Sequence, residues 1–200
     1  MNKLLLLKIL LFLCVVSPSY MATAQVDFFG SNTDNIEDGD DPAFNLDEAG
    51  YLTSAVVGGK TMVVATGYGE NGLSVFELTA AGTLTQAGLT PALANVTDDG
   101  ILHLESPYSL STASVGGTTF LVVAGDTDNG ISLFKLTTLG ITQAGLITPN
   151  VDNNPTFNLF EPNYVTTAVA GGKTYVVVAG EDGTGDAGLS VFELTALGEL

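Results

Sequence analysis

The sequence predicts an all-β protein built from tandem copies of a four-stranded antiparallel unit. A ten-residue phrase occurs three times, as GGKTMVVATG from Gly58, GGTTFLVVAG from Gly116 and GGKTYVVVAG from Gly171. The repeat period is therefore 58 and then 55 residues (58 to 116, and 116 to 171). The apolar runs are rich in β-branched, aromatic and small residues, and nothing beyond residue 24 has a helical period, so the units are predicted to consist of strands.

Each unit reads as four short strands in order. The first strands are expected at 52–57, 110–115 and 165–170, the second at 61–66, 119–124 and 174–179, the third at 73–78, 131–136 and 189–194, and the fourth at 84–89 and 141–146. The second strand is apolar at almost every position, which is typical of a strand covered on both faces. The third alternates, with Leu73 and Val75 facing one way and Ser74 and Phe76 the other. Gly-Gly between the first two strands predicts a tight hairpin.

A four-stranded antiparallel unit of this length in tandem predicts a β-propeller, with each unit forming one blade. A β-solenoid is the main competitor, but its coils are usually shorter, and a string of immunoglobulin-like sandwiches would need longer repeats. The chain holds two full repeats and a partial third that reaches Leu200. Because that is too few blades for a usual ring, we expect either the N-terminal fragment of a longer chain or a protein that closes by self-association.

The second and third strands resemble those of the lactonase-like (YVTN-type) seven-bladed propellers. The matching text is MVVATGYGENGLSVFEL, FLVVAGDTDNGISLFKL and YVVVAGEDGTGDAGLSVFEL, within a resemblance that covers Leu52–Leu200 as a style of repeat. The resemblance implies a propeller fold and, in the family's enzymes, lactone hydrolysis by arginine, histidine and acidic side chains in a central pocket. This chain has no arginine and one histidine, so it departs from that pattern.

The first 24 residues read as a secretory signal peptide. Lys3 and Lys8 flank a leucine-rich run, the apolar core is short, and Ala22-Thr23-Ala24 has the small-x-small form of a cleavage site. Residues 25–50 form an acidic lead-in, and residues 51–200 hold the blades, at about 51–107, 108–163 and 164–200, the last incomplete. The single cysteine, Cys14, lies in the signal, so the exported chain uses no disulfide. These features predict a bacterial protein that is secreted, periplasmic or on the cell surface, with no stable membrane insertion after cleavage.

The charge balance is strongly acidic, with 22 Asp and Glu against five Lys and a net charge of −17. Nucleic acid and anionic membranes are poor partners for such a surface, whereas cations are better ones; the plain alternative is that the charge serves solubility. In a propeller, the loops between the second and third strands of each blade lie at the same end of the blades as the segments that lead into the first strands. Most of the acids fall in those two places, so we expect them to gather there.

Two of these loops are candidate calcium sites. The candidate ligands, as carboxylate and amide oxygens in Asp- and Gly-rich loops, are Asp126, Asp128, Asn129, Glu181, Asp182 and Asp186. The competing interpretation is that Asp, Asn and Gly fill these loops because they form good turns. His103 occupies the repeat position of Asn45 and Asn158, which predicts a hydrogen-bonding role that holds this segment in place, because a lone histidine is a poor general base.

These observations favour an exported, non-enzymatic propeller that acts as a binding or scaffold module for a protein, glycan or small molecule, with Ca²⁺ as a candidate stabilising ion and no other cofactor. The alternative is a lactonase-like hydrolase whose catalytic residues lie beyond residue 200. A third candidate is a structural repeat array in an extracellular adhesin or matrix. No catalytic residue is assigned by the sequence.

Overall fold

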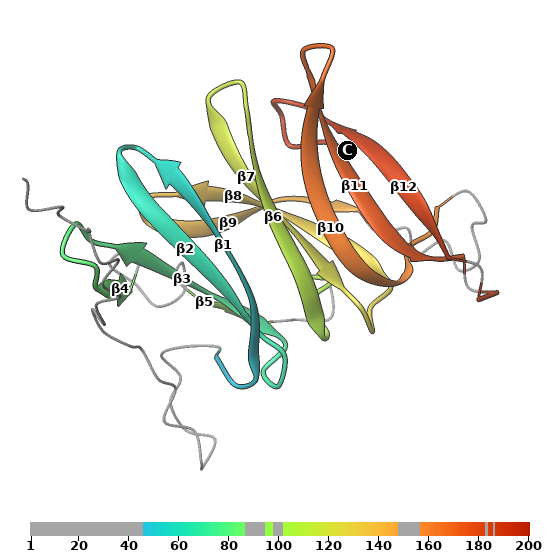
Figure 1. The fold of residues 1–200 in the computed structure, drawn as a ribbon, viewed down its shortest axis with the longest axis horizontal. Helices are drawn as coiled ribbons and strands as arrows, with labels where there is room; N and C mark the ends of the chain where they lie inside the picture. Colours follow the sequence, from blue (N-terminus) through green and yellow to red (C-terminus); the bar gives the residue numbers. More distant parts are fainter. Residues whose placement is uncertain (1–45, 87–94, 98–101, 148–156, 183, 186) are drawn as a thin grey trace, which may run out of the picture.

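A computed structural model describes residues 46–86, 95–97, 102–147, 157–182, 184–185 and 187–200. These residues form an all-β structure of three antiparallel sheets, one for each sequence repeat, with no helix in any of the described ranges. The sheets stand side by side in chain order (Figure 1).

The first sheet runs in the order β1-β2-β3-β4, and a further short strand, β5, also pairs with β3. Its strands are β1 (Ala49–Val57), β2 (Lys60–Gly67), β3 (Gly72–Leu78), β4 (Leu84–Gln86) and β5 (Asn95–Thr97). The second sheet has the order β6-β7-β8-β9 and the third the order β10-β11-β12. Their strands are β6 (Pro107–Val115), β7 (Thr118–Gly125), β8 (Gly130–Thr137), β9 (Gly140–Ile147), β10 (Phe160–Ala170), β11 (Lys173–Glu181) and β12 (Ala187–Leu194).

The strand predictions from the repeats are confirmed. Each predicted first, second and third strand lies within one observed strand, and the predicted fourth strand at 141–146 lies within β9. Of the fourth strand predicted at 84–89, residues 84–86 form β4 and the remainder lies outside the described residues. Strand β5 was not predicted, because its three residues show no alternating pattern.

The Gly-Gly hairpins form as predicted. Gly58 and Gly59 have φ angles of 55° and 81°, and the pairs that follow β6 and β10 repeat these values closely. This left-handed backbone is strained for residues that carry a Cβ. We call the end of the sheets with these turns the hairpin end, and the opposite end, which holds the β2–β3, β7–β8 and β11–β12 turns, the loop end.

The sheets stack face to face, and the second sheet has a core on each side. We call the side of a sheet toward the preceding repeat its front face and the side toward the following repeat its back face. The front face of the second sheet contributes Leu121, Val123, Phe134 and Leu136 to a core shared with the first sheet. Its back face contributes Phe120, Val122, Ile131 and Leu133 to a core shared with the third sheet. Neighbouring side chains of β7 therefore serve different cores, as the two-residue period of a strand requires.

The prediction that every second strand is covered on both faces holds for β7 only. From Thr119 to Gly125 every residue of β7 is buried. In β2 and β11 buried residues alternate with half-buried ones, so these strands are covered on one face. This difference arises because, among the described residues, the first and third sheets each pack against another sheet on one side only, whereas the second sheet packs on both sides.

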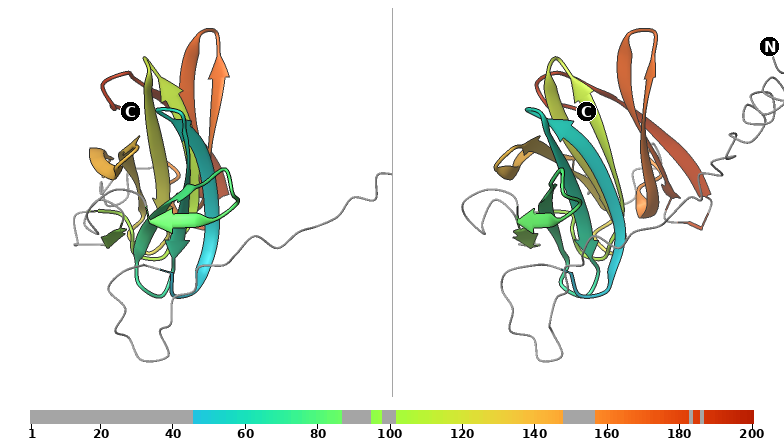
Figure 2. Two further views of the ribbon diagram at one scale, coloured as in Figure 1. Left: turned by 90° about the vertical axis from the view of Figure 1, so that its left-hand side faces the viewer. Right: turned by 60° about the vertical axis from the view of Figure 1, so that its left-hand side comes forward.

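The first strands of the three sheets lie next to one another. Strand β6 runs between β1 and β10 in Figure 1, and the right-hand view of Figure 2 keeps the same order. The row of sheets is open at both ends in the described residues.

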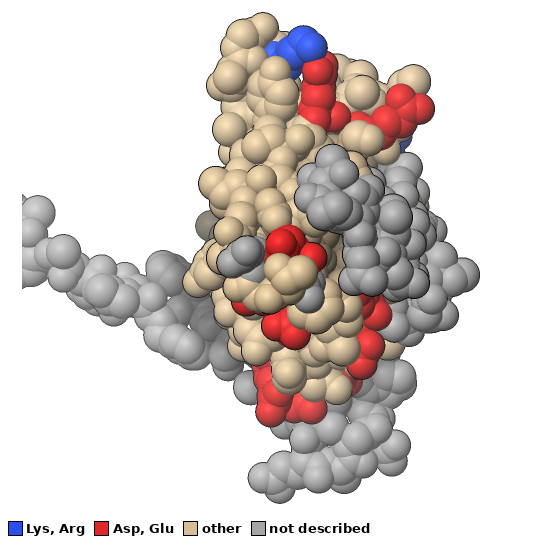
Figure 3. Space-filling model, turned by 90° about the vertical axis from the view of Figure 1, so that its right-hand side faces the viewer, with Lys and Arg blue, Asp and Glu red and all other residues tan. Residues whose placement is uncertain are grey.

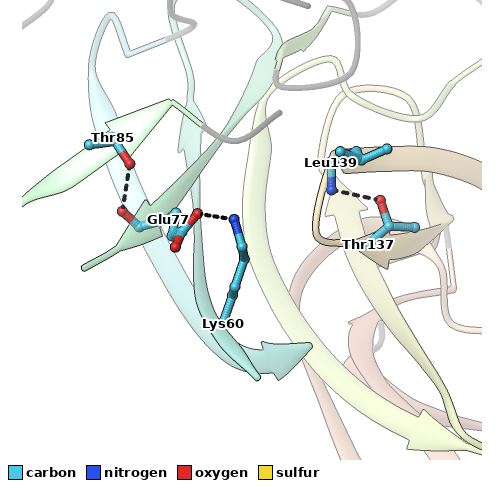
Figure 4. Close-up of polar contacts among 5 residues, drawn as sticks. All are labelled: Lys60, Glu77, Thr85, Thr137 and Leu139. Atoms are coloured by element: carbon cyan, nitrogen blue, oxygen red, sulfur yellow. Dashed lines mark hydrogen bonds and ion pairs between the residues drawn. The ribbon is translucent and has the colours of Figure 1, made fainter. Parts of the chain in front are cut away.

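Two equivalent ion pairs lie on the hairpin side of the first and third sheets. Lys60 and Lys173 each contact a glutamate of the third strand, Glu77 and Glu193, at 2.6 Å. Figure 4 shows the Lys60–Glu77 pair, the Thr85 hydroxyl on the Glu77 carbonyl, and the Leu139 N–H on Thr137 in the turn after β8. Both pairs are solvent-exposed and contribute little stability, but they engage two of the five lysines of the sequence.

Candidate functional site

The acidic loops and the segments that precede the first strands meet at the loop end, as the sequence predicts. In the first sheet the backbone N–H of Asp47 donates to Glu70 Oε2 at 3.2 Å. In the second, the N–H of Glu105 donates to Asp128 Oδ2 at 2.7 Å. The two contacts occupy the same repeat position, so one function of these acids is to fasten the incoming segment to its own sheet.

Of the candidate calcium ligands, the three in the β7–β8 turn lie together. Asn129 has a φ of 55°, and its Nδ2 donates to the Thr127 carbonyl at 3.1 Å. Burial raises the pKa of the Asp126 carboxyl above its usual value. Asp126 and Asn129 also close the turn through a backbone hydrogen bond of 3.3 Å. This is the geometry of a well-formed Asx-rich turn.

The other candidates belong to the β11–β12 turn. Asp182 Oδ1 accepts hydrogen bonds from the backbone N–H and the hydroxyl of Thr184, at 2.8 and 2.7 Å. Glu181 is half-buried at the end of β11. Asp186 lies outside the described residues. Across the ranges that the structure describes, no three His, Cys, Asp or Glu side chains come close enough to hold a metal ion.

Three tyrosines join the first and second sheets near the loop end. The Tyr108 ring lies 5.9 Å from that of Tyr51 and 5.5 Å from that of Tyr68, in tilted and edge-on arrangements. Tyr68 raises the pKa of the Tyr108 phenol, and desolvation and Asp126 add to the effect. Such contacts between rings are a packing function. The repeat counterpart of Tyr51, Tyr164, is 65% exposed on the third sheet.

An asparagine clamp connects each sheet to the next. The backbone N–H of Ser106 donates to Asn71 Oδ1 at 3.0 Å, and the N–H of Glu161 donates to Asn129 Oδ1 at 2.9 Å. All four residues have φ between 44° and 55°, in the left-handed region. Asparagine adopts that conformation more readily than most residues. The third repeat has Ala187 at this position, which offers no side-chain acceptor.

A second repeated bond joins the first strands. The Thr112 hydroxyl donates to the Ser54 carbonyl at 3.4 Å, and the Thr167 hydroxyl donates to the Thr112 carbonyl at 2.8 Å. This contact was not predicted from the sequence, because the β-propensity of threonine already accounts for its presence in a strand. The available signal was that Ser54, Thr112 and Thr167 share one repeat position, each carrying a hydroxyl.

His103 is a packing residue of the second sheet. Its backbone N–H donates to the hydroxyl of Ser132 at 2.8 Å, and its buried ring lies against Gly130, where a Cβ would come within 2.6 Å of the ring. Asn158 repeats the arrangement, donating to Ser190 at 2.9 Å. These main-chain hydrogen bonds hold the segment before the first strand against its own sheet. Its repeat counterpart Asn45 lies outside the described residues.

Comparison with models of known protein families and with curated protein sequences finds no match for this chain. Within the residues that the structure describes, no helix has the length and apolar character needed to cross a membrane.

Proposed function

We propose that this protein is an exported, non-enzymatic β-propeller module that acts as a scaffold or binding protein, with each sheet forming one blade. The observation that carries the proposal is the repeated joint between sheets: the Asn71 and Asn129 clamps and the Thr112 and Thr167 bonds recur at equivalent positions. Face-to-face stacking of antiparallel sheets with their first strands adjacent is what a propeller requires.

The polar side chains at the loop end support a structural function. Glu70, Asp128 and Asn129 each accept a backbone N–H from a segment leading into a first strand. An acid or amide that is engaged in this way positions loops, and rigid loops on a sheet scaffold form surfaces suited to binding. The partner on this account is a protein, a glycan or a small molecule.

The remaining parts of the proposal come from the sequence. The signal-like segment of residues 1–24 supports export, and the resemblance to lactonase-like propellers supports the blade assignment. Calcium is proposed as a stabilising ion at the acidic loops, with oxygen ligands from Asp126 and Asp128.

The proposal is tested by expressing the full precursor in a bacterium and isolating the exported product. We expect N-terminal sequencing of that product to start at Gln25, and a panel of lactones to be left unhydrolysed at protein concentrations where a lactonase turns over readily. Saturable hydrolysis that survives repurification and scales with protein concentration would overturn the non-enzymatic assignment. Retention of the product inside the cell would overturn the export assignment.

A further inference from the structure

The three tyrosines at the loop end depart from the sequence repeat. Tyr51 and Tyr68 belong to the first sheet and Tyr108 to the second, and we call them the tyrosine cluster. At the joint between the second and third sheets, the same repeat positions hold Ser109, Asp126 and Asn163. Of the two joints between described sheets, only the first therefore carries the cluster.

A joint between sheets forms without these rings. At the second joint, the Ser109 hydroxyl accepts the backbone N–H of Val165 at 3.1 Å. The asparagine clamps and the threonine bonds recur at both joints. Packing also leaves part of the cluster uncovered, because Tyr51 is 37% exposed and Tyr68 is 40% exposed. Exposed tyrosine that the fold does not require is typical of an interaction surface.

Carboxylates flank the tyrosine cluster on both sheets. On the first sheet, the Asp47 side chain lies against Gly69, the neighbour of Tyr68. On the second sheet, the Asp126 carboxyl lies close enough to Tyr108 to add to the raised pKa of that phenol, after Tyr68 and desolvation. The surface beside the rings is therefore negatively charged.

Positive and negative charges are separated along the sheets. The lysines of the described ranges all lie toward the hairpin end: Lys60, Lys135 and Lys173. The acidic turns lie at the loop end, and no lysine of the described ranges lies there. Figure 3 shows this separation on the third-sheet side, where the charged side chains in view toward the lower end are all acidic. A cationic partner is thus attracted to the end that carries the tyrosine cluster.

We propose that the tyrosine cluster and its flanking carboxylates bind a positively charged segment of another protein, with arginine or lysine side chains against the exposed rings. This rests on the proposed function as a binding module and names the class of its partner. The face of an aromatic ring carries negative potential, so the rings and the carboxylates favour the same charge. Arginine fits best, because its planar guanidinium stacks on a ring and also bonds a carboxylate. A neutral glycan would gain nothing from this charge.

The test titrates the purified exported protein with two synthetic peptides, at low ionic strength and with a chelator present to keep calcium off the acidic loops. One is an arginine–glycine peptide, and the other has citrulline in place of arginine, which keeps the side-chain shape and removes the charge. The chain has no tryptophan, so its intrinsic fluorescence comes from tyrosine and reports binding at the rings. We expect saturable binding of the arginine peptide, weakened by added salt, and no measurable binding of the citrulline peptide.

A double variant tests the contribution of the rings. Tyr51→Leu with Tyr68→Leu keeps both side chains apolar and removes both ring faces, so we expect binding to weaken about five- to thirtyfold, as for two cation–π contacts at exposed positions. Tyr164→Leu is the matched control, because Tyr164 is the repeat counterpart of Tyr51 and is 65% exposed outside the cluster. A double variant that binds like the wild type, or a control that loses as much, would overturn the proposal.

Tyrosine nitration of the wild type, mapped by mass spectrometry, tests the same surface without a substitution. The arginine peptide should protect Tyr51 and Tyr68 and leave Tyr164 reactive. Equal affinity for both peptides, or no binding of the arginine peptide, would overturn the proposal. Saturable binding of a neutral oligosaccharide in place of the peptide would also overturn it and assign a glycan. None of these results alters the exported, non-enzymatic assignment, which the export and lactone assays test separately.

Discussion

Asn129 Oδ1 accepts a hydrogen bond from the backbone N–H of Glu161 at 2.9 Å and so connects the second sheet to the third. The two residues are 32 positions apart, and both have left-handed backbone conformations. Asn71 and Ser106 form the same pair between the first and second sheets. The repeat therefore conserves, within one chain, a residue type, a backbone conformation and a partner.

Two substitutions of Asn129 distinguish the contribution of its side-chain acceptor from that of its left-handed backbone conformation. Asn129→Gly keeps the backbone conformation and loses the acceptor, so we expect a loss of about 1 kcal/mol in the free energy of unfolding. Asn129→Ala loses the acceptor as well, and alanine adopts the left-handed region less readily than glycine or asparagine, so we expect it to be less stable than Asn129→Gly by about 1–2 kcal/mol. Urea unfolding of the wild type and both variants measures whether their free energies of unfolding fall in this order. Equal stability of Asn129→Gly and the wild type would show that the bond contributes nothing.

The hydroxyl bond between first strands is tested by Thr167→Val. Valine keeps the shape and the strand preference of threonine but cannot donate to the Thr112 carbonyl, which now lies 2.8 Å from the hydroxyl. We expect a loss of about 1 kcal/mol in the free energy of unfolding. Thr142→Val on the exposed side of β9 is the control and should change stability little. A loss no larger than that of the control would argue against the bond.

Gly125 is expected to tolerate no side chain. A Cβ at this position would lie 2.5 Å from the His103 carbonyl oxygen and 2.7 Å from its carbon, and backbone atoms cannot move aside. Gly125→Ala should therefore cost about 1–3 kcal/mol through overpacking. Gly50→Ala is the matched control, since its nearest contact is an ordinary 3.7 Å. Thermal unfolding by circular dichroism compares the two. A similar melting temperature for both variants would contradict the close approach.

Calcium binding is tested by comparing the melting temperature of the protein in a chelator with its melting temperature in millimolar Ca²⁺. A ligand that binds only the folded state stabilises it, so we expect Ca²⁺ to raise the melting temperature. In Asp128→Asn the amide oxygen can still accept the Glu105 N–H, while the charge that attracts the cation is lost. This variant should keep its stability in chelator and lose part of the increase. An unchanged melting temperature of the wild type would remove calcium from the account.

The sequence predicts the strands well because the repeat presents each one two or three times. Agreement between Leu73, Ile131 and Leu189 identifies the third strand more firmly than any single copy could. The same repeat also indicates which loops share the acidic end, and the contacts of Asp128 and Glu70 confirm that placement for the residues the structure describes.

The features that could not be predicted from the sequence depend on contacts between one sheet and the next. Val64, Val122 and Val177 look alike in sequence, yet the first two are fully buried and the third is half-exposed, because burial depends on whether another sheet follows. The clamp between Asn129 and Glu161 was not predicted, because the two residues belong to different repeats. A side chain that bonds across a repeat boundary shows no local pattern.

The central claim is that successive repeats stack with their first strands side by side. The Ser111 and Thr167 side-chain oxygens lie 3.3 Å apart between β6 and β10, and the sole cysteine, Cys14, falls in the predicted signal. A Ser111→Cys, Thr167→Cys double variant can therefore be oxidised and its peptides identified by mass spectrometry. We predict an intrachain disulfide between residues 111 and 167 in the folded protein. Two persistent thiols in a folded, oxidised variant would contradict this stacking.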